Sequence, residues 1–199
     1  PAAIALAKLM VPETGTPETG SAAHRFEMPV ESVNLFDAAA RGAATGLNMA
    51  LNVGALLIVF VGLIFLLDKG ATALTGEKLT VLLGVAFRPF AWLMGVPGPD
   101  IRAASELLAT KTVFNEFLAY QQLQGLIAEG ALSKRSIVIL TYALCGFANL
   151  GSMGILIGGL SALAPGRRAE IARLSLWAVV SGTLASFTTA CVAGILAAE

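Results

Sequence analysis

Hydrophobic positions along this chain gather into long runs that short polar segments separate. The run at 47–67 reads LNMALNVGALLIVFVGLIFLL and has only Asn48 and Asn52 as polar interruptions. An α-helix rises about 1.5 Å per residue, so this run is about 31 Å long, enough to cross the hydrocarbon core of a bilayer. Because Asn34 is a good N-cap, the pattern predicts one long helix over 34–69 that begins amphipathic and becomes transmembrane.

Two further apolar runs predict transmembrane helices over 136–165 and 171–197. The middle of the first run, GFANLGS at 146–152, holds an amide, a hydroxyl and two glycines. Backbone that leaves helical hydrogen bonding at this depth persists only where it is buried in protein or lines a cavity. The first run is therefore predicted to be a broken helix around a polar site. In the second run, small residues recur at every fourth position and predict a stripe for close helix packing: Gly182, Ser186, Ala190 and Gly194.

Residues 101–130 predict a helical hairpin. The two limbs on either side of the polar segment Lys111–Glu116 have about ten to thirteen residues each and reach only about 15–20 Å, too short for a crossing. A re-entrant hairpin, which enters and leaves the bilayer on one side with its polar tip near the middle, explains this length. The alternative is an amphipathic helix pair on the surface, but the apolar positions leave little room for a wet face: Leu107, Leu108, Val113, Phe114, Phe117 and Leu118.

The remaining segments are less regular. Residues 76–100 carry an apolar run with Arg88-Pro89 at its centre. Proline breaks a helix and arginine is costly within a bilayer, so we expect two short interfacial or re-entrant helices here, not one span. Residues 1–33 are expected to be the tail of a helix followed by a solvated loop in which PETG occurs twice. Since the first residues look like the end of a helix, we expect the chain to be the C-terminal part of a larger protein.

Composition supports membrane insertion. Hydrophobic residues make up 56% of the 199 positions and charged residues only 13%, whereas soluble domains have about 25% charged residues. The fold class is therefore predicted to be an all-α integral membrane protein. A net charge of zero gives no basic surface for nucleic acid. Cys145 and Cys191 lie in apolar segments and are expected to be small buried residues, and the single His24 argues against a zinc site.

The polar residues at the hairpin tip and in the broken helix suit a polar ligand. A carboxylate such as Glu116 is tolerated near the bilayer centre if it binds a hydroxylated ligand or couples to a cation. Asn115 beside it adds a donor and an acceptor. Asn149 and Ser152 would lie on one face and suit a sugar or a heterocycle, with Phe147 as an apolar wall. Alternatively, Asn149 and Ser152 only bond to neighbouring helices.

Several motifs resemble those of one family. They are NEF at 115–117 followed by Ala119-Tyr120, ALCGFANLGSMGILIGGLSALAP at 143–165, LMVPET at 9–14 and DAAARGAATGLNMALNVGALLI at 37–58. Together they closely resemble the C-terminal half of the concentrative nucleoside transporter family, and the resemblance covers nearly the whole chain.

The resemblance implies roles for these residues. In the family, the ribose of the substrate contacts the glutamate of the hairpin motif and the asparagine and serine of the broken helix, which correspond to Glu116, Asn149 and Ser152. Phe147 corresponds to the phenylalanine beside the ligand. Family members are about twice as long and form an inverted repeat, a common transporter design. The first hairpin, which holds the nucleobase and helps to form the sodium site, has no counterpart here.

The resemblance therefore implies the C-terminal part of a cation-coupled nucleoside symporter that works by alternating access. Expected partners are nucleosides such as uridine, membrane lipid and the missing N-terminal half. A homotrimer in the cell inner membrane is expected, with the long helix contributing to the subunit interface. Sodium and proton remain open as coupling ions, no cofactor is expected and the metal ligands are unknown. Two alternatives stand beside this reading: a membrane-embedded enzyme with Glu116 and Lys111 as an acid/base pair, and a structural subunit that does not transport.

Overall fold

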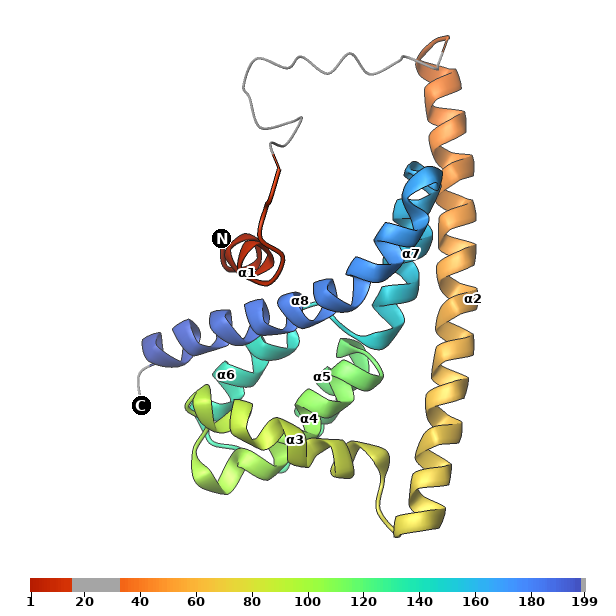
Figure 1. Ribbon diagram of the computed structural model, residues 1–199. Coiled ribbons are helices and arrows are strands. Elements are labelled where there is room, and N and C mark those ends of the chain that lie inside the picture. Colours follow the sequence, from red (N-terminus) through yellow and green to blue (C-terminus); the bar gives the residue numbers. More distant parts are fainter. Residues whose placement is uncertain (16–32, 198–199) are drawn as a thin grey trace.

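The computed structural model describes residues 1–15 and 33–197, and the regular structure of these residues is helical (Figure 1). The fold class predicted from composition and hydrophobic runs, all-α, is therefore confirmed. The second PETG and His24 lie outside the described residues. The helices in chain order are α1 (Ala2–Met10), α2 (Leu35–Thr75), α3 (Leu79–Leu93), α4 (Ile101–Val113), α5 (Glu116–Ala128), α6 (Lys134–Leu144), α7 (Leu150–Leu163) and α8 (Arg168–Leu196).

Helix α2 is the long helix expected from the 47–67 run. Asn34 caps it, since its Oδ1 accepts a hydrogen bond from the backbone N–H of Asp37 at 2.9 Å. The helix continues to Thr75, beyond the predicted end at 69, and stops at Gly76, whose φ of 78° is left-handed. It stands beside the other helices in Figure 1 and packs on α7 and α3. Large apolar side chains on it are exposed: Leu47, Leu51, Ile58, Val59, Leu63, Phe65, Leu66 and Leu67.

The expected break at Arg88-Pro89 is not present, so the prediction of two short limbs was wrong. Pro89 lies inside α3, which runs without interruption to Leu93. Packing along α4 compensates for the one backbone hydrogen bond that proline removes. At Gly84 the two helices approach so closely that a Cβ would lie 3.3 Å from Cγ of Glu106. Arg88 is exposed.

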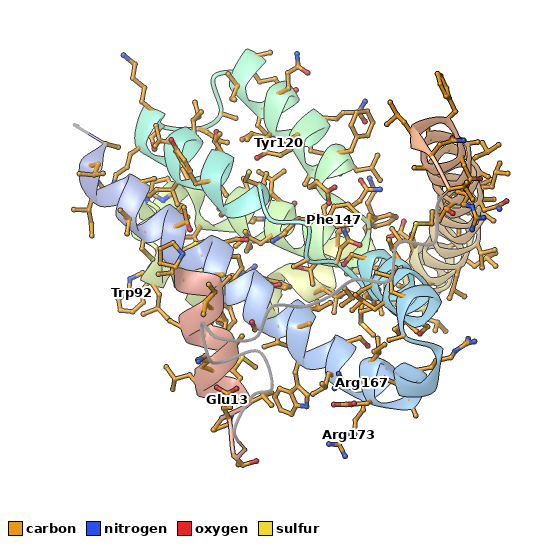
Figure 2. All side chains as sticks on the ribbon, turned by 90° about the horizontal axis from the view of Figure 1, so that it is seen from above. Glu13, Trp92, Tyr120, Phe147, Arg167 and Arg173 are labelled. Atoms are coloured by element: carbon orange, nitrogen blue, oxygen red, sulfur yellow. The ribbon has the colours of Figure 1, made fainter. Side chains whose placement is uncertain are left out.

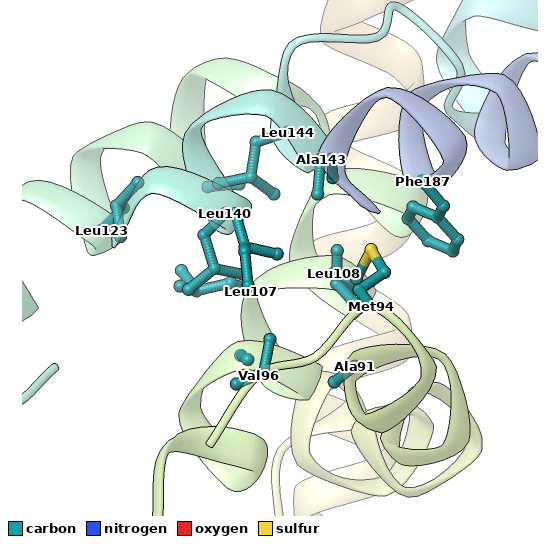
Figure 3. Packing of buried hydrophobic residues seen from close by; sticks show 14 of the residues in the cluster. Ala91, Met94, Val96, Leu107, Leu108, Leu123, Leu140, Ala143, Leu144 and Phe187 are labelled. Atoms are coloured by element: carbon teal, nitrogen blue, oxygen red, sulfur yellow. The ribbon is translucent and has the colours of Figure 1, made fainter. Parts of the chain in front are cut away.

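The hydrophobic core lies where α3, α4, α6 and α8 meet. Figure 3 shows this cluster, which includes Leu107 and Leu108 of α4, Leu140 and Leu144 of α6, and Phe187 of α8.

The small-residue stripe of α8 packs as predicted. Ala190 is fully buried in the core, and a Cβ on Gly194 would lie 2.9 Å from Cγ1 of Ile139 on α6. The stripe therefore lets α8 lie directly against the helices that carry the polar positions.

Asp100 ties the base of the α4–α5 hairpin to the start of α6. Its Oδ2 accepts hydrogen bonds from the backbone N–H of Ser133 at 3.0 Å, from Ser133 Oγ at 2.7 Å and from the hydroxyl of Ser136. Burial opposes ionisation of this carboxyl group. The three hydrogen bonds outweigh burial, and the pKa of Asp100 is lowered from its ordinary value.

One described helix, Arg168–Leu196, is both long and apolar enough to cross a membrane. Leu79–Leu93 and Leu150–Ser161 are apolar but shorter.

Candidate functional site

The hairpin turn brings Glu116 to the start of a helix. Helix α4 ends at Val113 and α5 begins at Glu116, so the turn consists of Phe114 and Asn115. Asn115 caps α5 through its Oδ1, which accepts from the backbone N–H of Leu118 at 2.9 Å. The positive end of the helix dipole favours the negative charge of Glu116 in the first turn.

The broken helix has a second capped N-terminus. Helix α6 ends at Leu144 and α7 begins at Leu150. Oδ1 of Asn149 accepts from the backbone N–H of Ser152 at 2.7 Å, and Oγ of Ser152 accepts from the backbone N–H of Asn149 at 3.0 Å. This reciprocal capping box satisfies backbone groups that the break exposes, and it holds both side chains in place. Both residues are buried.

The two capped helix ends meet. The side-chain amide of Asn149 donates to the carboxylate of Glu116, with 3.0 Å between Nδ2 and Oε2. Among the described residues, this is the one hydrogen bond that the Glu116 carboxylate accepts. Oε1 of the half-buried Glu116 is therefore open to accept from a hydroxylated ligand.

The predicted site residues differ in how the structure uses them. Glu116, Asn149 and Ser152 form one hydrogen-bonded group. Asn115 serves as a helix cap in the turn beside them. Phe147 lies in the break, as Figure 2 shows, and is 59% exposed, so it is not part of the core.

Two features of the break were not foreseen. Cys145 was expected to be buried, but it is exposed, and it lies just past the end of α6. Lys111 is fully buried, with Nζ donating to the backbone carbonyl of Ala143 at 3.4 Å and lying 5.9 Å from the ring centroid of Phe187. The sequence places Lys111 in the polar segment of the hairpin and, in the enzyme alternative, pairs it with Glu116, but no pattern around it signals this burial.

A cavity of about 620 Å³ lies between α1, the break, α7 and α8. Phe147 and Ser152 line it, whereas Glu116 and Asn149 do not. The cavity therefore reaches only one side of the polar group. Within the described part of the chain, no cluster of three His, Cys, Asp or Glu side chains is placed to hold a metal ion.

Known proteins are similar to this chain in sequence and in fold. The family described as Na+ dependent nucleoside transporter C-terminus matches residues 1–194. The chain is 42% identical to the uncharacterized transporter YutK of Bacillus subtilis, over 98% of this chain and 49% of that protein. It is 37% identical to the nucleoside permease NupC of Helicobacter pylori, over 98% of this chain and 48% of the permease.

Solved structures of CNTnw are also similar to this chain. A variant of CNTnw in an intermediate state is similar with a TM-score of 0.82 and 41% identity, covering 96% of this chain and 47% of that one. The chain spans about half the length of YutK and of NupC.

Proposed function

Because the chain belongs to the Na+-dependent nucleoside transporter family, whose C-terminal part it matches, we propose that it forms the ribose-binding side of the substrate pocket in a cation-coupled nucleoside symporter. The family is one of transporters and not of enzymes, so the enzyme alternative is set aside. The nucleoside transporters of this family are membrane proteins.

The observation that carries the proposal is the hydrogen bond between Asn149 and Glu116. It holds one carboxylate oxygen, Oε2, and leaves Oε1 able to accept a further hydrogen bond. That second oxygen accepts from a ribose hydroxyl, and a charge-assisted bond of this kind is about twice as strong as a neutral one. Ser152 keeps Asn149 in its capping position. The exposed ring of Phe147 offers an apolar face to the ligand.

Alternating access suits the arrangement of the helices. In this proposal the hairpin α4–α5 is re-entrant, and it moves with the broken helix α6–α7 against the scaffold helix α2. Helix α2 contacts α7 and α3 and leaves much of its apolar surface exposed. That surface faces lipid and neighbouring subunits of a homotrimer in a multi-pass protein of the cell inner membrane.

Coupling to sodium or to protons completes the proposal. The family is described as Na+ dependent. In this proposal, the N-terminal half of the full-length protein, which this chain does not include, supplies the nucleobase side of the pocket and most of the ion site. Uptake of radiolabelled uridine into proteoliposomes by the full-length protein, with a sodium or a proton gradient imposed separately, tests the function. Uptake driven by neither gradient, together with no uridine binding, would favour a structural subunit instead.

A further inference from the structure

Lys111 is a buried cation close to the polar group of the proposed site. It lies in the last turn of α4, and none of its surface is exposed. A lysine is rarely buried without a partner, because an ammonium group loses its hydration there at a cost of several kcal/mol. Something on the protein must therefore compensate this charge.

Ion pairs within contact distance do not provide the compensation. Among the described residues, the four salt bridges are all exposed or partly exposed pairs that do not include Lys111. The hydrogen bond from Nζ to the carbonyl of Ala143 is long at 3.4 Å, and the ring of Phe187 adds a weak attraction. These neutral contacts alone fall short of the cost of burial.

Two sources of negative potential act on the ammonium group. Ala143 belongs to the last turn of α6, where unsatisfied carbonyl groups carry a partial negative charge. A full negative charge, the carboxylate of Glu116, stands at the other end of the hairpin turn, where it accepts a hydrogen bond from Asn149 of the same break that Nζ of Lys111 approaches through Ala143.

The packing fixes Lys111 at the junction of three elements. Its own helix belongs to the hairpin, Ala143 and Gly146 belong to the broken helix, and Phe187 belongs to α8. A Cβ on Gly146 would lie 3.5 Å from Nζ and would overlap Oγ of Ser186. The absence of a side chain at Gly146 thus leaves the space in which the ammonium group and α8 meet the break.

We propose that Lys111 is a positioning residue whose ammonium group is the internal counter-charge of Glu116 and holds the hairpin against the broken helix, so that Glu116 stays within reach of Asn149. The part of this inference that concerns nucleoside binding rests on the proposed function. The charge pairing itself does not, because it acts in the protein without ligand.

A double-mutant cycle on the full-length protein tests the charge pairing. The thermal unfolding temperature is measured in detergent without nucleoside for the unmodified protein, Lys111→Met, Glu116→Gln and the double variant. Lys111→Met keeps a chain of similar length but leaves the Glu116 charge unbalanced. We expect it to lower the unfolding temperature strongly, and we expect most of that loss to disappear when Glu116→Gln is also present.

An equal loss with and without Glu116→Gln would show that Lys111 only closes the end of α6 and would overturn the proposal. An unchanged unfolding temperature for Lys111→Met would overturn it as well. If Lys111→Met prevents folding, recovery of folded protein in the double variant supports the proposal, and failure to recover contradicts it.

Uridine binding gives the second measurement. Lys111→Met should weaken uridine binding by about tenfold or more, because Glu116 would lose the counter-charge that holds it in place. Lys69→Met is the matched control, because Lys69 also lies over a ring, that of Phe65, but is exposed; it should change neither measurement. If the unmodified protein binds no nucleoside, the proposed function fails, while the cycle still measures the coupling between Lys111 and Glu116.

Discussion

The side-chain amide of Asn149 lies 3.0 Å from the carboxylate of Glu116, although the two residues are 33 positions apart in the sequence. Each residue stands at the N-terminus of a helix, where the helix dipole is positive. The contact therefore joins the hairpin and the broken helix at a negative charge that is suited to bind hydroxyl groups.

Replacing Glu116 by Gln in the full-length protein should reduce nucleoside uptake to near background while leaving membrane expression intact. A hydrogen bond to a charged group contributes about 1.5–3 kcal/mol, which is about 10- to 150-fold in affinity. Radiolabelled uridine uptake and surface expression are the measurements. Glu129→Gln, at the exposed end of the same helix, is the control and should transport normally. Uptake near the unmodified level in Glu116→Gln would remove Glu116 from the site.

Substitutions of Asn149 should separate its two roles. Asn149→Ala removes both the cap of α7 and the donor to Glu116, and loss of a cap costs about 0.5–2 kcal/mol of stability. Asn149→Asp keeps a good cap but places a second carboxylate beside Glu116. We expect Asn149→Asp to be more stable than Asn149→Ala in thermal unfolding, yet to bind uridine no better. If Asn149→Asp binds uridine normally, the amide donor is not needed.

The hairpin and the interruption of the following helix could be predicted from the sequence, because the hairpin limbs were too short for a crossing and the polar segment at 146–152 does not suit a plain membrane helix. The helix caps that Asn115 and Asn149 form were not predicted. The continuous helix through Pro89 could not be predicted, since it depends on packing against α4. The burial of Lys111 likewise depends on residues of α6 and α8 that are distant in the sequence. The assignment of Glu116, Asn149 and Ser152 to ribose binding stays a prediction.

Gly146→Ala should destabilise the protein by about 1–3 kcal/mol, the usual cost of overpacking. The added Cβ would overlap Oγ of Ser186 and lie 3.1 Å from Cβ of that residue. Thermal unfolding measures the effect, and Ser186→Gly in the same protein should restore most of the loss. Gly125→Ala in α5 is the control. Its Cβ meets no atom within 4 Å, so it should be neutral or stabilising by about 0.4–1 kcal/mol. If Gly146→Ala and Gly125→Ala lose the same amount of stability, the flexibility of glycine, and not the space at the break, explains the effect.

Asp100 should make stability depend on pH in the acid range. Burial raises the pKa of this carboxyl group, but hydrogen bonds from Ser136 and Ser133 outweigh burial, so the pKa in the folded protein lies below the ordinary value of 3.8. A lowered folded pKa means that the unfolded chain binds the proton more readily, so ionised Asp100 stabilises the fold. This stabilisation is complete well above pH 3.8 and is lost as the pH falls below 3.8 through the lower folded pKa.

The pH dependence is measured by comparing thermal unfolding of the unmodified protein and Asp100→Asn in detergent. The variant should be less stable at neutral pH, since an amide accepts the three hydrogen bonds less strongly than a carboxylate does. The difference between the two proteins should stay constant down to about pH 5 and shrink at lower pH. Glu170→Gln is a useful comparison, because Glu170 pairs with Arg167 at the surface and an exposed pair contributes little to stability. A difference for Asp100→Asn that is the same at pH 7 and at the acid limit would mean that shape, and not the charge of Asp100, holds the hairpin base to α6.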